Sequence, residues 1–258
     1  MTWNEIVLLL ASGVIVGIIN TLGGGGSVIT MSLFMAMGMP IGIANGTNRI
    51  AVLLQNFSAT VAFLRKGMLH LKSGVLLSIP AIFGNIFGAM VATEVSDSVF
   101  KICLSVVLAI ILVYLLLGKD NEQVTGGHGL KLKWWHYLLF FIIGFYGGYI
   151  YIGLGFLILA IAIWTMKLDI ITANVIKGFV IFLSTPFALA VFIYNDQVEW
   201  MAGLLHGVGN ILGALLASHW AMSWGVKFVR WFTLFIIVVF FIDLMGWISL
   251  QELLSGLL

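Results

Sequence analysis

The amino-acid sequence predicts an all-α polytopic membrane protein built from two inverted-topology repeats. The first indication is composition: 62% of the 258 residues are hydrophobic, and only 9% are Asp, Glu, Lys or Arg. A soluble domain carries about 25% charged residues, so this chain cannot cover itself with a water-compatible surface. The second indication is a set of long stretches without charge, and the third is a glycine–asparagine motif that occurs twice.

Composition also excludes several classes of protein. Twelve basic and ten acidic side chains are too few for a face that neutralises phosphates, so we expect no nucleic acid partner. The single cysteine rules out an internal disulfide and a cysteine-based metal cluster. The sequence carries no HExxH or GxSxG motif. We therefore expect no enzyme, no cofactor and no metal; the expected partners are membrane lipid and a small anionic substrate, and a homodimer is left open.

Charge-free stretches define the expected elements in chain order. Crossing the hydrocarbon layer takes about 20 apolar residues in a helix. Stretches 5–37 and 135–166 are longer than one span and too rich in glycine for one straight helix. Single spans are expected at 41–64, 72–93, 98–117, 170–194, 199–218 and 227–249.

A polar linker divides the chain near its midpoint. We assign 1–118 to a first transmembrane repeat, 119–134 to the linker and 135–258 to a second repeat. The segment Gly84-Asn85-Ile86-Phe87-Gly88-Ala89 returns 125 residues later as Gly209-Asn210-Ile211-Leu212-Gly213-Ala214. Ala44-Asn45 returns 129 residues later as Ala173-Asn174. Agreement in order and spacing favours a duplication.

The basic residues predict how the repeats are oriented. Arg65, Lys66 and Lys72 crowd one junction of the first repeat, which is therefore expected on the cytoplasmic side. The matching junction of the second repeat holds Asp196 and Glu199 and no basic residue. The central linker is expected in the cytoplasm because it carries lysines, namely Lys119, Lys131 and Lys133. Equivalent loops then fall on opposite faces, which is the pattern of an inverted repeat.

The same topology makes each long apolar stretch begin and end on one side of the membrane. Each is either a pair of short crossings or a re-entrant pair of half-helices, broken near Gly23–Gly26 and Gly147–Gly155. We favour re-entrant pairs, because about 16 residues per arm is short of the length that a crossing needs. Irregular backbone at this depth must be buried in protein or line a wet cavity.

The first break is a candidate anion site. Four glycines cannot hold a helix, and a new helix can start at Ser27, a good N-cap residue. Free N–H groups at the positive end of that half-helix attract an anion. The expected binding residues of this break are Gly24, Gly25, Gly26 and Ser27. The alternative is a tight helix crossing at which only glycine fits.

Two cations lie deep inside expected spans. Arg49 and Lys177 are each about 12 Å from a span end, approached from opposite faces. A charge within the membrane is a functional-site hypothesis by default. The alternatives are side chains that reach the interface, or pairing with backbone carbonyls at a helix break. Neutral neighbours that orient oxyanions complete the expected substrate site: Asn45, Thr47, Asn48 and Asn174.

A third group of polar residues is assigned to a path or relay: Asn20, Gln55, Asn85, Asn210, His206 and Tyr149. For Asn85 and Asn210, hydrogen bonding between helices is the favoured role. His206 is the only histidine deep in a span and suggests a proton relay. A structural histidine with satisfied hydrogen bonds is the more common case.

The motifs resemble those of the sulfite exporter TauE/SafE family, also called the toluenesulfonate uptake permeases. The resemblance rests on Gly13, Gly17, the run Gly24-Gly25-Gly26, Pro40 and Gly46-Thr47-Asn48. It implies a secondary transporter of small sulfur-containing anions, such as sulfite or sulfoacetate, in a prokaryotic plasma membrane. The second half departs from the family pattern, with Gly153-Leu154-Gly155 in place of a full glycine run and Asn174–Lys177 in place of a GTS-like triplet.

These expectations combine into one functional hypothesis. The chain is expected to export a small sulfur-containing oxyanion through a midplane site at the repeat interface. The alternative is a proton- or sodium-coupled uptake permease for a sulfur-containing or other small organic anion.

Overall fold

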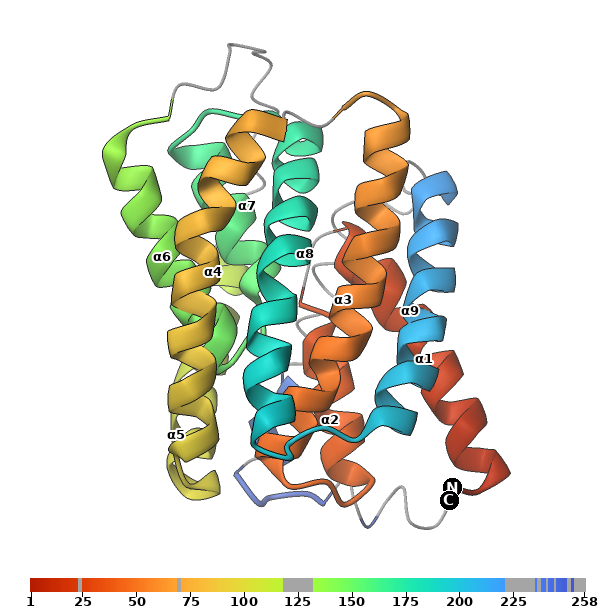
Figure 1. Cartoon of the computed structure of the whole chain (residues 1–258). Coiled ribbons are helices and arrows are strands. Elements are labelled where there is room, and N and C mark those ends of the chain that lie inside the picture. The colour runs from red at the N-terminus through yellow and green to blue at the C-terminus, as the bar shows by residue number, and fades with distance from the viewer. Residues whose placement is uncertain are drawn as a thin grey trace.

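The described part of the chain is a bundle of helices. The computed structural model describes residues 1–22, 25–68, 71–117 and 132–220, and only single residues and short runs between 235 and 252. Within these ranges the helices are α1 (Trp3–Leu22), α2 (Ser27–Ala36), α3 (Ile41–Arg65), α4 (Leu71–Glu94), α5 (Asp97–Leu117), α6 (Trp134–Tyr149), α7 (Leu154–Trp164), α8 (Ile170–Tyr194) and α9 (Trp200–Trp220) (Figure 1).

The expected spans agree with these helices to within two residues at each end. Stretches 41–64, 72–93, 98–117, 170–194 and 199–218 correspond to α3, α4, α5, α8 and α9. By length and apolar composition, α1, α4, α8 and α9 can cross a membrane. Most of the expected span 227–249, and residues 119–131 of the linker, lie outside the described residues.

Each long apolar stretch is broken into two helices, as expected. Stretch 5–37 forms α1 and α2, and stretch 135–166 forms α6 and α7. The 10 residues of α2 and 11 residues of α7 rise only about 15–17 Å, roughly half of the hydrocarbon thickness. α2 ends beside the start of α3, at the end of the bundle where α1 begins (Figure 1). α2 and α7 are therefore too short for a full crossing, whereas α1, with 20 residues, is long enough for one, and the re-entrant arrangement stays a prediction.

Helices from opposite halves make the closest backbone contacts. α4 lies against α6, and α9 lies against α1. A Cβ atom added at Gly84 or Gly88 would fall on backbone atoms of α6, and one added at Gly209 or Gly213 on backbone atoms of α1. The duplicated glycines are therefore crossing points at which the backbones touch.

We expect Gly148→Ala to destabilise the protein by about 1–3 kcal/mol, because the new methyl group would overlap the Asn85 carbonyl oxygen across the α4–α6 contact. Gly178→Ala is the matched control: this glycine also lies in a helix, but the nearest atom to its added Cβ, Asn56 Oδ1, is at an ordinary 3.6 Å. Thermal unfolding in detergent micelles measures both variants. Equal losses would show that the glycine contact does not hold the two halves together.

Other helix contacts of the bundle also join the first half of the chain to the second half. α3 lies against α8 at the centre, α4 also contacts α8, and α9 also contacts α3. The N-terminal part of α3 meets the C-terminal end of α8, since Gly46 lies against Phe192 and the Gln197 backbone. α3 and α8 therefore run in opposite directions, as do α4 and α9 (Figure 1).

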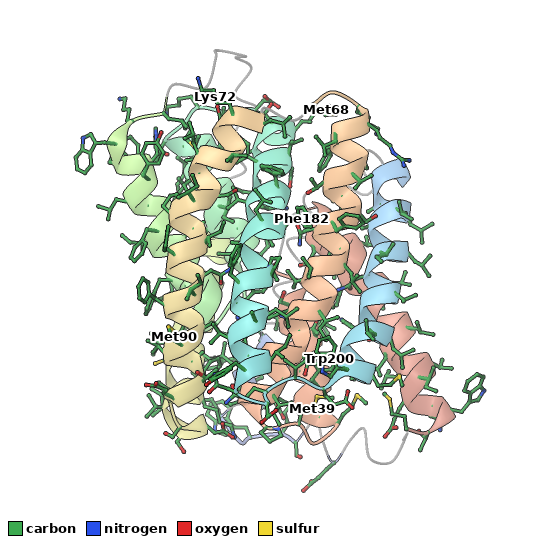
Figure 2. The ribbon with its side chains drawn as sticks, in the orientation of Figure 1. Met39, Met68, Lys72, Met90, Phe182 and Trp200 are labelled. Carbon is green, nitrogen blue, oxygen red and sulfur yellow. The ribbon has the colours of Figure 1, made fainter. Side chains whose placement is uncertain are left out.

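The apolar interior is divided into two cores. One surrounds α2 and includes Met31, Phe34 and Phe192; we call it the α2 core. The other surrounds α7 and includes Leu77 and Ile158; we call it the α7 core. The α2 core lies toward the end of the bundle that carries Met39 and Trp200, and the α7 core toward the end that carries Lys72 (Figure 2). Arg49 lies between the two cores, with Tyr151 of the α7 core and Phe192 of the α2 core beside its guanidinium.

At the start of α8, the Asp169 carboxylate accepts hydrogen bonds from the backbone N–H groups of Ile171 and Thr172, both at 3.0 Å. Partial burial raises the pKa of this carboxyl, but the hydrogen bonds from Thr172 and Ile171 outweigh it, and the net pKa is lowered. The stability that the lowered pKa contributes is present above the ordinary pKa of aspartate and is lost as the pH falls through the lowered value.

We expect Asp169→Ala to cost about 1 kcal/mol of stability through loss of this helix cap. Asp169→Asn keeps an oxygen that can cap the helix, so it should cost less and should remove the acid sensitivity of this contact. Thermal unfolding at neutral and acidic pH separates the two effects. If Asp169→Ala unfolds like the wild type, α8 does not depend on its cap.

Candidate functional site

A small cavity lies where the two helix breaks meet. It has a volume of about 20 Å³, enough for one water molecule. The first break contributes Asn20, Gly25 and Ser27, and the second contributes Tyr151 and the residues Gly153–Gly155. α3 and α8 close the cavity with Gln55, Asn56, Lys177 and Ile181. The cavity therefore joins both halves of the chain.

Lys177 is the cation of this cavity. Only 5% of its surface is exposed. Its ammonium group donates to Asn174 Oδ1 at 2.7 Å and to the Asn20 carbonyl oxygen at 3.2 Å. The carbonyl belongs to the last turn of α1, so Lys177 from the second half holds the broken helix of the first half.

Asn20 organises the first break. Its side-chain oxygen accepts from the Gly26 N–H at 2.8 Å, and its amide nitrogen donates to Gln55 Oε1 at 3.2 Å. Gly25 has φ 95°, a conformation that glycine adopts without strain. α2 starts at Ser27 as expected, but the N-cap is Gly26 and no side chain caps this helix. Ser27 is the first helical residue, so the expected N-cap role was wrong.

The second break is organised in a related way. α7 begins after Gly153, which has φ 75°, and no side chain caps it. The N-terminal ends of α2 and α7 both border the cavity. Each end carries a partial positive charge from the helix dipole, which adds to the charge of Lys177. The ends of α2 and α7 and the Lys177 ammonium therefore all favour a negative charge in the cavity.

Arg49 lies beside the cavity and does not line it. Its guanidinium is fully buried and donates to the carbonyl oxygens of Gly147 and Gly148 and to Asn45 Oδ1. The rings of Tyr151 and Phe192 lie 4.7 and 5.4 Å from the guanidinium carbon, within the range of a cation–π interaction. Arg49 therefore holds the last turn of α6.

Each of the two cations binds a helix that belongs to the other half of the chain. Arg49 comes from the first half and holds α6 of the second; Lys177 comes from the second half and holds α1 of the first. Each is helped by an asparagine one turn away, Asn45 or Asn174, and the Asn45 side chain also donates to the Tyr149 carbonyl oxygen. The alternative in which both side chains reach the membrane interface is wrong, because both are buried. Both side chains donate to backbone carbonyls at a helix break, and their role as substrate ligands stays a prediction.

The Gly46-Thr47-Asn48 motif serves the junction between α8 and α9. Gly46 lies against the Gln197 carbonyl oxygen, where a Cβ would not fit. The Thr47 hydroxyl oxygen accepts from the Glu199 N–H at 2.8 Å, just before α9. The Asn48 side chain is buried, and neither of its polar atoms has a hydrogen bond within the described residues. Thr47 and Asn48 do not border the cavity described above.

His206 is fully buried and held on both nitrogens. Nδ1 lies 3.1 Å from the Leu9 carbonyl oxygen, and Nε2 lies 2.9 Å from the Thr30 hydroxyl. Because a carbonyl oxygen only accepts, Nδ1 carries the hydrogen, and in the neutral ring Nε2 accepts from Thr30. His206 thus ties α9 to α1 and α2 as a structural histidine. Its relay role stays a prediction.

Among the remaining predicted residues, Gln55 and Asn20 border the cavity, and Asn85, Asn210 and Tyr149 do not. Asn85 and Asn210 are buried at the glycine crossings, but Asn85 Oδ1 and both polar atoms of the Asn210 side chain have no hydrogen bond within the described residues. The Tyr149 ring contacts Phe100 and Phe145. Gly24 lies outside the described residues.

Some cavity residues were missing from the predicted site. These are Tyr151, Gly153, Leu154, Gly155 and Ile181, together with Asn56. One signal could have found the glycines: Lys177 follows Arg49 by 128 residues, and the same offset places Gly153 on Gly25 and Gly155 on Ser27. Comparing the two breaks position by position would have extended the site to the second half.

A membrane bundle with two broken helices and a buried cation between them defines a membrane transport protein. The comparisons with known proteins agree with this class. The model of the family described as sulfite exporter TauE/SafE matches residues 9–244. The chain belongs to this family.

Curated bacterial relatives carry the same class of name. A probable membrane transporter protein, ORF9, of a Sinorhizobium species is 29% identical over 89% of this chain and 88% of its own length. A probable membrane transporter protein of Haemophilus influenzae is 27% identical over 87% and 88%, and YfcA of Escherichia coli K12, also named a probable membrane transporter protein, is 26% identical over 86% and 83%. No solved structure matches the chain. The chain is a transporter rather than an enzyme, as expected.

Proposed function

We propose that this protein exports a small sulfur-containing oxyanion, such as sulfite, sulfoacetate or a similar organosulfonate, from a prokaryotic cell. The proposal rests on one observation above all: the buried Lys177 ammonium borders a cavity onto which the N-terminal ends of α2 and α7 also open. An ammonium and two helix N-termini favour a negative charge, and the amide groups of Asn20 and Gln55 supply polar contacts for oxygen atoms.

The scaffold for this activity is proposed to be an inverted repeat. The contacts between the two halves support it. α4 of the first half lies against α6 of the second half, and α9 of the second half lies against α1 of the first half. The opposite directions of α3 and α8 and of α4 and α9 also support it (Figure 1). Transporters with such repeats place the substrate near the midplane between discontinuous helices.

Transport would require the cavity to widen on one side at a time. A cavity of about 20 Å³ holds one water molecule, and a sulfite ion has four heavy atoms. In this proposal the α2 core closes one side of the cavity, and the α7 core, which supplies the lining residues Tyr151, Leu154 and Ile181, closes the other. Movement of α2 would open the first side, and movement of α7 would open the second.

The basic end of the bundle, with Arg65, Lys66, Lys72 and Lys133, is proposed to face the cytoplasm together with the central linker. The inside-negative membrane potential then favours anion exit by about 2.3 kcal/mol per charge per 100 mV. Export therefore requires no coupling ion, whereas uptake would require one.

Flux in proteoliposomes tests the proposal. Vesicles loaded with sulfite or sulfoacetate should release it faster than protein-free vesicles, and an inside-negative potential should raise the rate. Sulfate and acetate serve as competing anions. Flux that is insensitive to potential but driven by a proton or sodium gradient would replace export with the coupled uptake alternative. No flux of any sulfur-containing anion would refute the substrate class.

A further inference from the structure

A second hollow lies on the lipid-facing side of the bundle, between α4 and α6. It measures about 470 Å³ and is lined only by apolar and aromatic side chains, from Leu76 to Phe87 on α4 and from Tyr137 to Phe141 on α6. Phe83 and Phe87 are about half exposed, at 55% and 52%. In a membrane protein, side chains exposed on this side face acyl chains. We call this hollow the α4–α6 groove.

The groove has the length of one lipid tail. Leu76 and Phe87 are eleven residues apart on one helix, which corresponds to about 16 Å. One leaflet of the hydrocarbon layer is about 15 Å thick, half of about 30 Å. A single acyl chain that enters at Leu76 would therefore fill the groove.

Two lysines lie one helical turn beyond the groove, one beside each helix, and the Lys133 ammonium is 6.0 Å from the centre of the Trp135 ring. Lys72 is one helical turn before Leu76, at the end of the bundle shown at the top of Figure 2. Lys133 immediately precedes α6 and is one turn before Tyr137. Both are exposed, and neither forms an ion pair with an acidic side chain of the described residues.

The helix register places the two lysines at the same depth. Gly84 meets Gly144, and Gly88 lies against the start of the turn that contains Gly148, so α4 and α6 run in parallel with an offset of about 60 residues. With this offset, Lys72 is level with residue 132, next to Lys133. Two cations at the same depth match an anionic lipid headgroup. The apolar α4–α6 groove below them matches the acyl chain of the same lipid.

The pseudo-equivalent surface of the other half does not share this chemistry. The glycine crossings of α9 and α1 are built like those of α4 and α6. At the positions equivalent to Lys72 and Lys133, however, the chain has Gln197 and Thr2. The aromatic positions Phe83, Phe87 and Phe141 correspond to Val208, Leu212 and Leu10. The two lysines and the aromatic side chains therefore occur together between α4 and α6, and both are absent between α9 and α1.

We propose that the α4–α6 groove binds one anionic phospholipid, with an acyl chain between Leu76 and Phe87 and the phosphate held by Lys72 and Lys133. The site is separate from the cavity at Lys177, and the proposal does not depend on which anion the protein transports. A lipid bound here would cover the α4–α6 contact on its membrane side.

Native mass spectrometry of the detergent-solubilised protein tests the proposal with two lipids of identical chains, phosphatidylglycerol and phosphatidylcholine. The wild type should retain phosphatidylglycerol more tightly. Lys72→Gln and Lys133→Gln should each weaken phosphatidylglycerol binding about fivefold, with phosphatidylcholine unaffected. Lys66→Gln, at the same end of the bundle but directly after α3, is the control and should change neither. Equal retention of the two lipids by the wild type would overturn the proposal.

A second pair of variants tests the tail. Ile79→Trp should fill the groove and reduce the binding of both lipids. Leu204→Trp, the equivalent change on α9, should leave binding unchanged. If Ile79→Trp instead converts a dimer into a monomer and leaves phosphatidylglycerol binding intact, the groove is an interface with a second copy, and the lipid proposal is wrong.

Discussion

Lys177→Met is expected to lower anion flux by about 10- to 100-fold and to cost about 1–3 kcal/mol of stability, because the Asn20 carbonyl oxygen loses its donor. The methionine side chain replaces the apolar stem of the lysine, but the cavity loses its ammonium group. A hydrogen bond to a charged group contributes about 1.5–3 kcal/mol, and each 1.36 kcal/mol corresponds to a factor of ten in rate. The helix N-termini of α2 and α7 would remain, so residual flux should persist.

Proteoliposome efflux of sulfite measures the effect, and circular dichroism with size-exclusion chromatography confirms that the variant folds. Lys177→Arg should restore part of the flux because it restores the charge. Lys66→Met removes a lysine at the basic end of the bundle and should transport like the wild type. Flux in Lys177→Met equal to that of the wild type would remove Lys177 from the site and leave the cavity without its cation.

The spans of this protein were predictable because lipid imposes a simple rule on the chain. Charged residues of the described helices lie near helix ends, apart from Arg49 and Lys177, so α3 was expected at 41–64 and α8 at 170–194. The two breaks were predictable for a related reason, since a run of glycines does not hold a helix.

The partners of the site residues were not predictable in the same way. The sequence shows that Arg49 is deep in a span, but its acceptors belong to a helix end 98 and 99 positions away. Which way a buried side chain points depends on how α3 is rotated against α6 and α8, and no local pattern sets that rotation. Thr47 illustrates the same limit: it was grouped with Arg49 as an anion ligand, yet its hydroxyl faces the start of α9.

Tyr151 shows why the second break was less predictable than the first. It has φ 69°, a backbone conformation that is rare for a residue with a Cβ. Tertiary contacts hold it there: the ring lies against the Arg49 guanidinium, and the neighbouring Ile152 carbonyl oxygen accepts from the Tyr146 hydroxyl. Because the second break depends on such tertiary contacts, it is harder to recognise in the sequence than the first break, which contains four consecutive glycines.

The contrast between the two cations leads to the second large effect, at Arg49. We expect Arg49→Ala to destabilise the fold by about 2–6 kcal/mol, because it leaves the carbonyl oxygens of Gly147 and Gly148 without their donors, at about 1–3 kcal/mol for each buried group. Transport should fall as well, since the last turn of α6 positions the second break. In this role Arg49 is a positioning residue rather than a ligand of the anion.

Two measurements separate positioning from binding. If Arg49 acts through α6, Arg49→Lys should recover part of the lost stability, and the flux that remains should keep its wild-type preference among sulfite, sulfoacetate and sulfate. The Lys177→Met variant should lose less stability than Arg49→Ala, since Lys177 serves one backbone carbonyl and Arg49 serves two, but it should lose more flux. An Arg49→Ala variant that is as stable as the wild type but no longer discriminates among these anions would contradict the positioning role. Arg49 would then contact the substrate directly, and its hydrogen bonds to Gly147 and Gly148 would break during transport.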